Sequence, residues 1–296
     1  MPWVILAFVN TALDGAGNIL DGHMSNRYFR NPWTLLFFFG ILDVFLLPIL
    51  FLFRLPQAIG LSQLALFMLI GALNATVLAL YYLALQEDDT SIVSSLFSLG
   101  KVTVPVFAFF IVGERLHLSQ YIAFMVVVVC SSALAMHTLK GKVTISKAFV
   151  LMLGASLMNS LIGVLYKFSL ERVDWVTSFT YVTIFSAGSV FVISLFRVKA
   201  IRTHWVTAKQ HARTLIAISL MGWVASLCGT AALSVASVTV VKGIFATQPL
   251  FVIAYTWMFQ RRWPHLFKEN MTRGHILKKG ILFAIIILTL VFIVRE

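Results

Sequence analysis

Residues 90–115 read TSIVSSLFSLGKVTVPVFAFFIVGER, and the rest of the chain is best understood from this stretch. Its polar positions fall at i, i+3, i+7, i+10 and i+14, so a helix would carry them on one face: Ser91, Ser94, Ser98, Lys101 and Pro105. The other faces carry Ile, Val, Leu and Phe over about 20 residues, enough to cross a bilayer. A charge at mid-membrane depth costs at least ~2.5 kcal/mol, which makes Lys101 a functional candidate.

The composition extends this interpretation to the whole chain. Of 296 residues, 60% are hydrophobic and 11% are charged, and the mean hydropathy is +0.93, which predicts a polytopic membrane protein. The net charge is +12, and the lysines and arginines lie in short gaps between apolar runs. There they set the orientation of the chain in the membrane and contact anionic lipid head groups. We therefore expect no nucleic-acid partner.

Enzymatic and metal-binding motifs are missing from the sequence. HExxH, GxSxG and GxGD do not occur, so we expect no enzyme, no cofactor and no metal site. Cys130 and Cys228 lie in apolar runs without CxxC spacing, which predicts thiols packed as small hydrophobic groups.

Charged or turn-rich gaps divide the sequence into ten apolar spans, which predicts an all-α protein with ten transmembrane helices. The expected spans are 3–20, 33–53, 62–85, 91–112, 119–137, 148–167, 176–196, 214–233, 238–259 and 277–294. The two halves repeat at a shift of about 148 residues, for example at Phe97 and Phe245. Five spans per half force the second copy to enter from the opposite side. We expect two inverted five-helix repeats, residues 1–140 and 141–296.

Basic residues are distributed unequally between the two sides of this topology. The loops on the side of the termini hold five: Arg54, Arg115, Lys167, Arg172 and Arg295. The opposite side holds sixteen, from Arg27 to Lys279. By the positive-inside rule, the sixteen-charge side is cytoplasmic and both termini lie outside.

Several segments resemble the drug/metabolite transporter superfamily, specifically its ten-span EamA-type members. They are Tyr81-Tyr82-Leu83-Ala84-Leu85, Ser91-Ile92-Val93-Ser94-Ser95-Leu96, Val112-Gly113-Glu114-Arg115-Leu116, Ala231-Ala232-Leu233 and Gln248-Pro249-Leu250-Phe251-Val252. The chain departs from the family pattern where Lys101 replaces the usual proline of the fourth span, and where Arg261-Arg262 replaces the first copy's Gly113-Glu114. Ten-span members of this family are usually drawn with both termini in the cytoplasm. The count of basic residues predicts the opposite orientation for this chain.

The resemblance implies a central cavity lined by the first and fourth spans and their second-half counterparts. The first span carries the polar stripe Asn10, Asp14, Asn18 and Asp21, and its counterpart carries Asn159, Gly163 and Lys167. We expect substrate-binding residues among Asp14, Asn18, Asn74, Tyr81, Ser94, Ser98, Lys101, Asn159, Trp223 and Lys242. Tyr82, Ser226 and Thr230 are further wall candidates, with simple packing as the alternative for each.

The roles of Asp14, Lys101 and Lys242 have more than one possible interpretation. Asp14 and Lys101 are expected to face each other, either as a transport pair, as a structural ion pair, or with Asp14 protonated. In the first case Asp14 is the candidate coupling carboxylate. Lys242 lies about one turn from the membrane edge, where its side chain would otherwise snorkel to the interface. Asp43 is expected to have a structural partner, because second spans in this fold are mostly peripheral.

Two functions from different classes fit these features. The first is a secondary transporter that moves a small polar or zwitterionic metabolite, amino-acid-like or otherwise bearing an anionic group, by alternating access. The alternative is a non-transporting scaffold or a carrier-lipid flippase subunit. The expected partners are the lipid bilayer, a small-molecule substrate and a coupling proton or sodium ion, in a monomer or homodimer of a bacterial or archaeal inner membrane.

Overall fold

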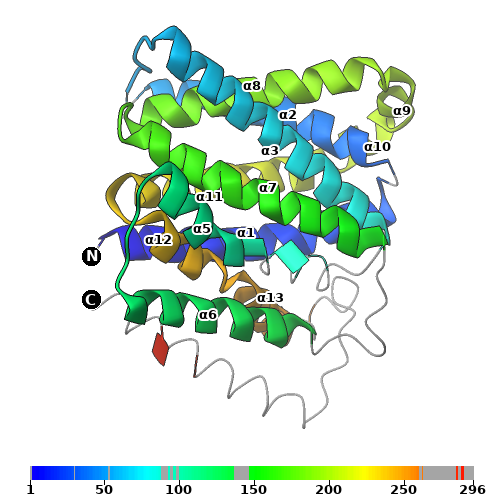
Figure 1. Cartoon of the computed structure of the whole chain (residues 1–296). Coiled ribbons are helices and arrows are strands. Elements are labelled where there is room, and N and C mark those ends of the chain that lie inside the picture. The colour runs from blue at the N-terminus through cyan, green and yellow to red at the C-terminus, as the bar shows by residue number, and fades with distance from the viewer. Residues whose placement is uncertain are drawn as a thin grey trace.

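The computed structural model describes residues 2–29, 31–52, 54–87, 93, 96–97, 100–136, 147–259, 262, 285 and 288–289, with the backbone alone at 131–136 and 200. Within these residues the secondary structure is entirely helical (Figure 1). The first half contains α1 (Pro2–Arg27), α2 (Pro32–Phe51), α3 (Leu61–Glu87), the 3₁₀ helix η1 (Gly100–Thr103), α5 (Val104–Ile111) and α6 (Leu118–Met136). The second half contains α7 (Lys147–Leu170), α8 (Trp175–Leu195), α9 (Val198–Thr203), α10 (Trp205–Gln210), α11 (Ala212–Val235), α12 (Val238–Phe245) and α13 (Gln248–Phe259).

The described residues include seven helical segments that are long and apolar enough to cross a membrane. They are α1, α2, α3, α7, α8, α11 and the stretch Val238–Phe259, which comprises α12 and α13. Two shorter apolar segments, Gly100–Ile111 and Leu118–Cys130, overlap the predicted fourth and fifth spans. The predicted tenth span, 277–294, lies outside the described residues apart from three positions. The all-helical membrane class is therefore confirmed, whereas ten spans and an inverted repeat stay predictions.

Local sequence explains where several of these helices begin. Asn31 caps α2 by accepting a hydrogen bond from the Trp33 amide, and Pro32 follows at a position whose missing N–H costs nothing. Asp174 caps α8 in the same way, accepting from the amides of Val176 and Thr177. The Arg54 guanidinium lies 3.9 Å from the Asp174 carboxylate and ties the preceding loop to this helix end.

The helices run roughly side by side across the molecule in Figure 1. α3 packs against both α7 and α8, α2 packs against α8 and α11, and α1 packs against α11 and α13. Helices from the two halves therefore alternate in space. The expectation that the second span is peripheral is wrong, because its contacts with α8 and α11 bring one face of α2 into the interior.

The predicted fourth span is not one regular helix where it is described. A 3₁₀ turn at Gly100–Thr103 precedes the eight-residue helix α5, and Pro105 lies in the first turn of α5. Ser91, Ser94 and Ser98, which complete the predicted polar stripe, lie outside the described residues. The ninth span is also interrupted, because α12 ends at Phe245 and α13 begins at Gln248, just before Pro249.

Candidate functional site: a polar cavity between the halves

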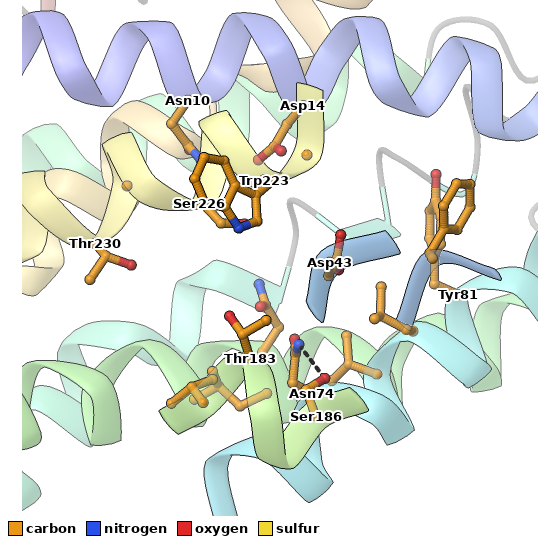
Figure 2. Close-up of a pocket in the computed structure, with 18 of the residues that line it drawn as sticks. Asn10, Asp14, Asp43, Asn74, Tyr81, Thr183, Ser186, Trp223, Ser226 and Thr230 are labelled. Carbon is orange, nitrogen blue, oxygen red and sulfur yellow. Dashed lines mark hydrogen bonds between the residues drawn. The ribbon is translucent and has the colours of Figure 1, made fainter. Parts of the chain in front are cut away.

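A cavity of about 390 Å³ lies inside the helical bundle. Its walls come from α1, α2, α3, α7, α8 and α11, together with η1 and the interrupted segment α12–α13. Figure 2 shows Asn10 and Asp14 projecting from α1 on one side, with Asn74, Thr183 and Ser186 on the other. Polar side chains from both halves of the sequence therefore converge on one cavity.

All of the predicted site residues that the structure describes line this cavity. They are Asp14, Asn18, Asn74, Tyr81, Lys101, Asn159, Trp223 and Lys242. Tyr82, Ser226 and Thr230 line it as well. Ser94 and Ser98 lie outside the described residues. The structure thus brings the candidates together, and their role in binding a substrate stays a prediction.

Lys101 joins the two interrupted spans. Its side chain is only 3% exposed, and Nζ donates a 2.8 Å hydrogen bond to the carbonyl oxygen of Phe245. Phe245 is the last residue of α12, where carbonyl groups lack helical partners and carry partial negative charge. Lys101 therefore satisfies an otherwise exposed acceptor while its ammonium group remains at the cavity wall.

The 3₁₀ turn that carries Lys101 is held tightly against α7. The Ser160 hydroxyl donates to the carbonyl oxygen of Gly100 at 3.0 Å. A Cβ atom at position 100 would collide with the side chain and backbone of Ser156. The absence of a side chain at Gly100 thus permits the close approach that sets the depth of Lys101.

Lys242 and Asp14 complete the charged centre. Lys242 is 7% exposed and points inward across Gly163, so the alternative of a lysine snorkelling to the membrane edge is wrong. Asp14 is attracted electrostatically to both Lys101 and Lys242. Among the described residues, however, Asp14 has no ion-pair partner within 4.0 Å. The contact ion pair between Asp14 and Lys101 is therefore not formed in this structure.

Two tyrosines of α3 hold the polar stripe of α1. The Tyr81 hydroxyl donates to Asn18 Oδ1 at 3.0 Å, and the Tyr82 hydroxyl donates to Asp21 Oδ1 at 3.1 Å. Asp21 is 9% exposed, so its carboxyl group is removed from bulk water and depends on this partner. The two bonds fix the rotation of α1 and thereby direct Asp14 into the cavity.

The opposite wall contains two further hydrogen-bonded pairs. Asp43 Oδ1 of α2 accepts from the Ser219 hydroxyl of α11 at 2.7 Å, and Asn74 Nδ2 of α3 donates to the Ser186 hydroxyl of α8 at 3.1 Å (Figure 2). Each pair links a helix of the first half to one of the second. Asp43 thus has the expected structural partner, but it also lines the cavity.

Two polar side-chain groups at the cavity, the Asn10 amide and the Trp223 indole, retain unused hydrogen-bonding capacity. Asn10 Nδ2 donates to the Ala225 carbonyl at 2.9 Å, whereas Asn10 Oδ1 has no partner among the described residues. The indole N–H of Trp223 likewise has no partner there, and its ring packs edge-on against Phe179. Buried donors and acceptors are normally paired, so these two groups are available to form hydrogen bonds with a polar molecule in the cavity.

The turn between α11 and α12 is held by charged side chains at both ends. The Glu114 carboxylate accepts hydrogen bonds from the Ser237 hydroxyl at 3.0 Å and from the amides of Val238 and Thr239 at 2.9 and 3.2 Å. Lys167 Nζ donates to two carbonyls at the end of α11, at 2.9 and 2.8 Å. These contacts match the helix dipoles, because the acid lies at an N-terminus and the lysine at a C-terminus.

Sequence reasoning did not select several of the cavity residues. Asp21, Asp43, Ser186 and Gln248 were not among the candidates, although each lies on the cavity wall. Asp21 was recognisable as part of the α1 stripe, and Gln248 by its place before Pro249. No periodic signal singles out Ser186.

Among the residues that the structure describes, no group of three or more His, Cys, Asp or Glu side chains could hold a metal ion.

Comparisons with known proteins agree with this architecture. Residues 1–136 match the model of the EamA-like transporter family. A solved structure titled "Crystal structure of protein" superposes with a TM-score of 0.62 over 95% of this chain and 95% of that chain, at 14% identity, which is a likeness of fold. No protein with a curated description matches the chain. The match over residues 1–136 confirms, for the first half of the chain, the resemblance to the EamA-like transporter family seen in the sequence. Together with the long apolar helices, it identifies the chain as an integral multi-pass membrane protein.

Proposed function

We propose that this protein is a secondary transporter that moves a small polar or zwitterionic metabolite bearing an anionic group by alternating access. The observation that carries the proposal is the pair of buried lysines, Lys101 and Lys242, on the wall of one cavity, with Asp14 as the acid attracted to both. Asp21 and Asp43 line the same cavity, but each accepts a hydrogen bond from a neighbouring hydroxyl group. Beside the two lysines, one carboxylate therefore faces two ammonium groups. An anionic cargo group would balance the second ammonium group at the point where the two interrupted spans meet.

The same interruptions support the proposed architecture of two inverted repeats, residues 1–140 and 141–296. The fourth and ninth spans correspond in the repeat, and both are broken into short pieces at the cavity. Discontinuous helices at the substrate site are a common device of inverted-repeat transporters, because helix ends there offer uncompensated backbone groups to a ligand. The Lys101 bond to Phe245 joins the two breaks across the repeat interface.

The alternative functions predict a different distribution of polar groups. A carrier-lipid flippase needs polar side chains that open sideways between helices, and a scaffold needs no polar cavity. The polar side chains described above face one another across the bundle, which favours a transporter of a small solute. A second cavity between α2 and α8 is lined by apolar residues and glycine alone and offers no polar path.

The proposal is tested by reconstituting the full chain into liposomes and measuring counterflow of labelled solutes. The panel should contain amino acids, dicarboxylates, phosphorylated compounds and quaternary amines. We expect exchange of at least one compound with an anionic group, above that of empty liposomes. Folded protein that exchanges none of them, while scrambling a fluorescent lipid between leaflets, would instead identify a flippase.

We further expect Asp14 to be the coupling carboxylate. A cavity that opens to water on alternate sides changes both the hydration of Asp14 and its attraction to the lysines, so a proton can be bound in one state and released in the other. Asp14→Asn should therefore abolish accumulation against a gradient, while exchange without a gradient persists.

The matched control for this prediction is Asp43→Asn. Asp43 lines the same cavity but is engaged by Ser219, so its replacement should leave the pH dependence of accumulation intact. If Asp14→Asn protein accumulates cargo with unchanged pH dependence, Asp14 is structural and the coupling group lies elsewhere.

A further inference from the structure

The connection between α8 and α11 is a short helical segment with a strongly basic surface. Residues 196–213 contain five basic residues, Arg197, Lys199, Arg202, Lys209 and Arg213, and no acidic residue. All five are exposed. None of them forms an ion pair with another of the residues described in the structure. The segment therefore presents uncompensated positive charge at one end of the helical bundle.

The same segment presents large apolar side chains next to these charges. Phe196 is 83% exposed, Val206 is 65% exposed, and Val198 and Trp205 are also exposed. In water the exposed apolar surface of these side chains is unfavourable. At the boundary of a bilayer both kinds of group find a partner, because apolar side chains enter the acyl region while lysine and arginine reach the head groups.

Packing holds α9 against α2 and α8, and α10 against α11. Ile201 and Ala208 are buried and anchor one face of each short helix. The Trp205 ring lies 5.5 Å from the ring of Phe38 on α2, and the His211 ring lies 3.9 Å from the ring of Tyr28 after α1. The basic surface is thus a fixed feature of the fold at the level where α1, α2, α8 and α11 end (Figure 1).

We propose that α9 and α10 form a binding surface for anionic phospholipids, in which lysine and arginine contact the phosphate head groups and the apolar side chains contact the acyl chains. Charge complementarity selects an anionic lipid over a zwitterionic one. The exposed Phe196, Val198 and Val206 select a lipid over free phosphate, since phosphate has nothing to place against them. The surface lies outside the cavity, so the proposal is independent of which solute is transported.

The test uses the full chain in a neutral detergent, with dioleoylphosphatidylglycerol and dioleoylphosphatidylcholine as probes and intact-complex mass spectrometry as the readout. Near a membrane surface each basic residue contributes about a fivefold preference for anionic lipid. We expect the unmodified protein to retain phosphatidylglycerol at least tenfold over phosphatidylcholine. The triple variant Lys199→Gln, Arg202→Gln, Lys209→Gln should lose most of this preference.

The matched control is the double variant Arg115→Gln, Arg172→Gln, which removes exposed arginines from the opposite end of the bundle. It should retain the preference in full. Because all three substitutions in the test variant are at exposed positions, folding should be preserved. Salt titration of the unmodified protein gives a measurement without mutation, and added salt should weaken phosphatidylglycerol binding.

Three outcomes would overturn the proposal. The first is equal retention of the two lipids by the unmodified protein. The second is a control variant that loses as much preference as the test variant. The third is displacement of phosphatidylglycerol by inorganic phosphate at equal concentration, which would identify a site for the free anion.

Discussion

Replacing Lys101 by methionine is expected to abolish transport while the yield of folded protein stays close to that of the unmodified chain. Methionine preserves the length and apolar stem of the side chain, but it removes the ammonium group that faces the cavity. Removing one partner of a buried charged contact typically costs about 2–5 kcal/mol, which is a loss of affinity of roughly thirtyfold or more. Counterflow in proteoliposomes measures the loss.

The matched control for this change is Lys209→Met, which removes an exposed lysine far from the cavity. Its transport rate should be unchanged. Lys101→Arg keeps the charge and should retain part of the activity, because a longer side chain can reach the same cargo group from a shifted position. Normal transport by the Lys101→Met protein would show that Lys101 serves only to bind the Phe245 carbonyl.

Glu114→Ala is expected to destabilise the fold, although Glu114 lies outside the cavity. The carboxylate accepts hydrogen bonds from one hydroxyl and two backbone amides at the start of α12, and loss of an N-terminal cap alone costs about 0.5–2 kcal/mol. Hydrogen bonds to a charged group contribute more, so a total of about 2 kcal/mol or more is expected. The midpoint of thermal unfolding in detergent should fall accordingly.

Two further variants serve as comparisons for the loss of stability in Glu114→Ala. Glu114→Gln keeps one carbonyl acceptor and should lose less stability than Glu114→Ala. Glu171→Ala removes an exposed acid, also attracted to Lys167, that caps no helix and should leave the unfolding midpoint unchanged. A Glu114→Ala protein as stable as the unmodified chain would mean that water replaces the carboxylate at α12 without cost.

The sequence predicted correctly those features that depend on the pattern of residues along a single helix. Hydropathy located the long helices, and the spacing of Asp14 and Asn18 placed both on the cavity side of α1. The same reasoning treated the fourth and ninth spans as continuous helices, because an apolar run carries no mark for a change from 3₁₀ to α geometry. Pro105 and Pro249 were the local signals of a bend in these two spans.

Contacts between distant residues were beyond the reach of the sequence. The hydrogen bond from Lys101 joins residues 144 apart, and no pattern names Phe245 as its acceptor. Asp43 was assigned to a peripheral helix, although packing of α2 on α8 and α11 turns it inward. Such placements depend on which helices become neighbours, and helix periodicity does not contain that information.

The close contact between Lys242 and Gly163 determines what a natural substitution at Gly163 would do to the cavity. A Cβ atom at position 163 would occupy the place of the Lys242 side chain, close to its ammonium nitrogen. Gly163→Ala looks conservative, since alanine is small, neutral and a better helix former. In this fold it would nevertheless force the end of the Lys242 side chain to shift, and the ammonium group would move with it. A ranking of variants by the chemistry of the altered residue alone would miss this movement of a charge at the cavity wall.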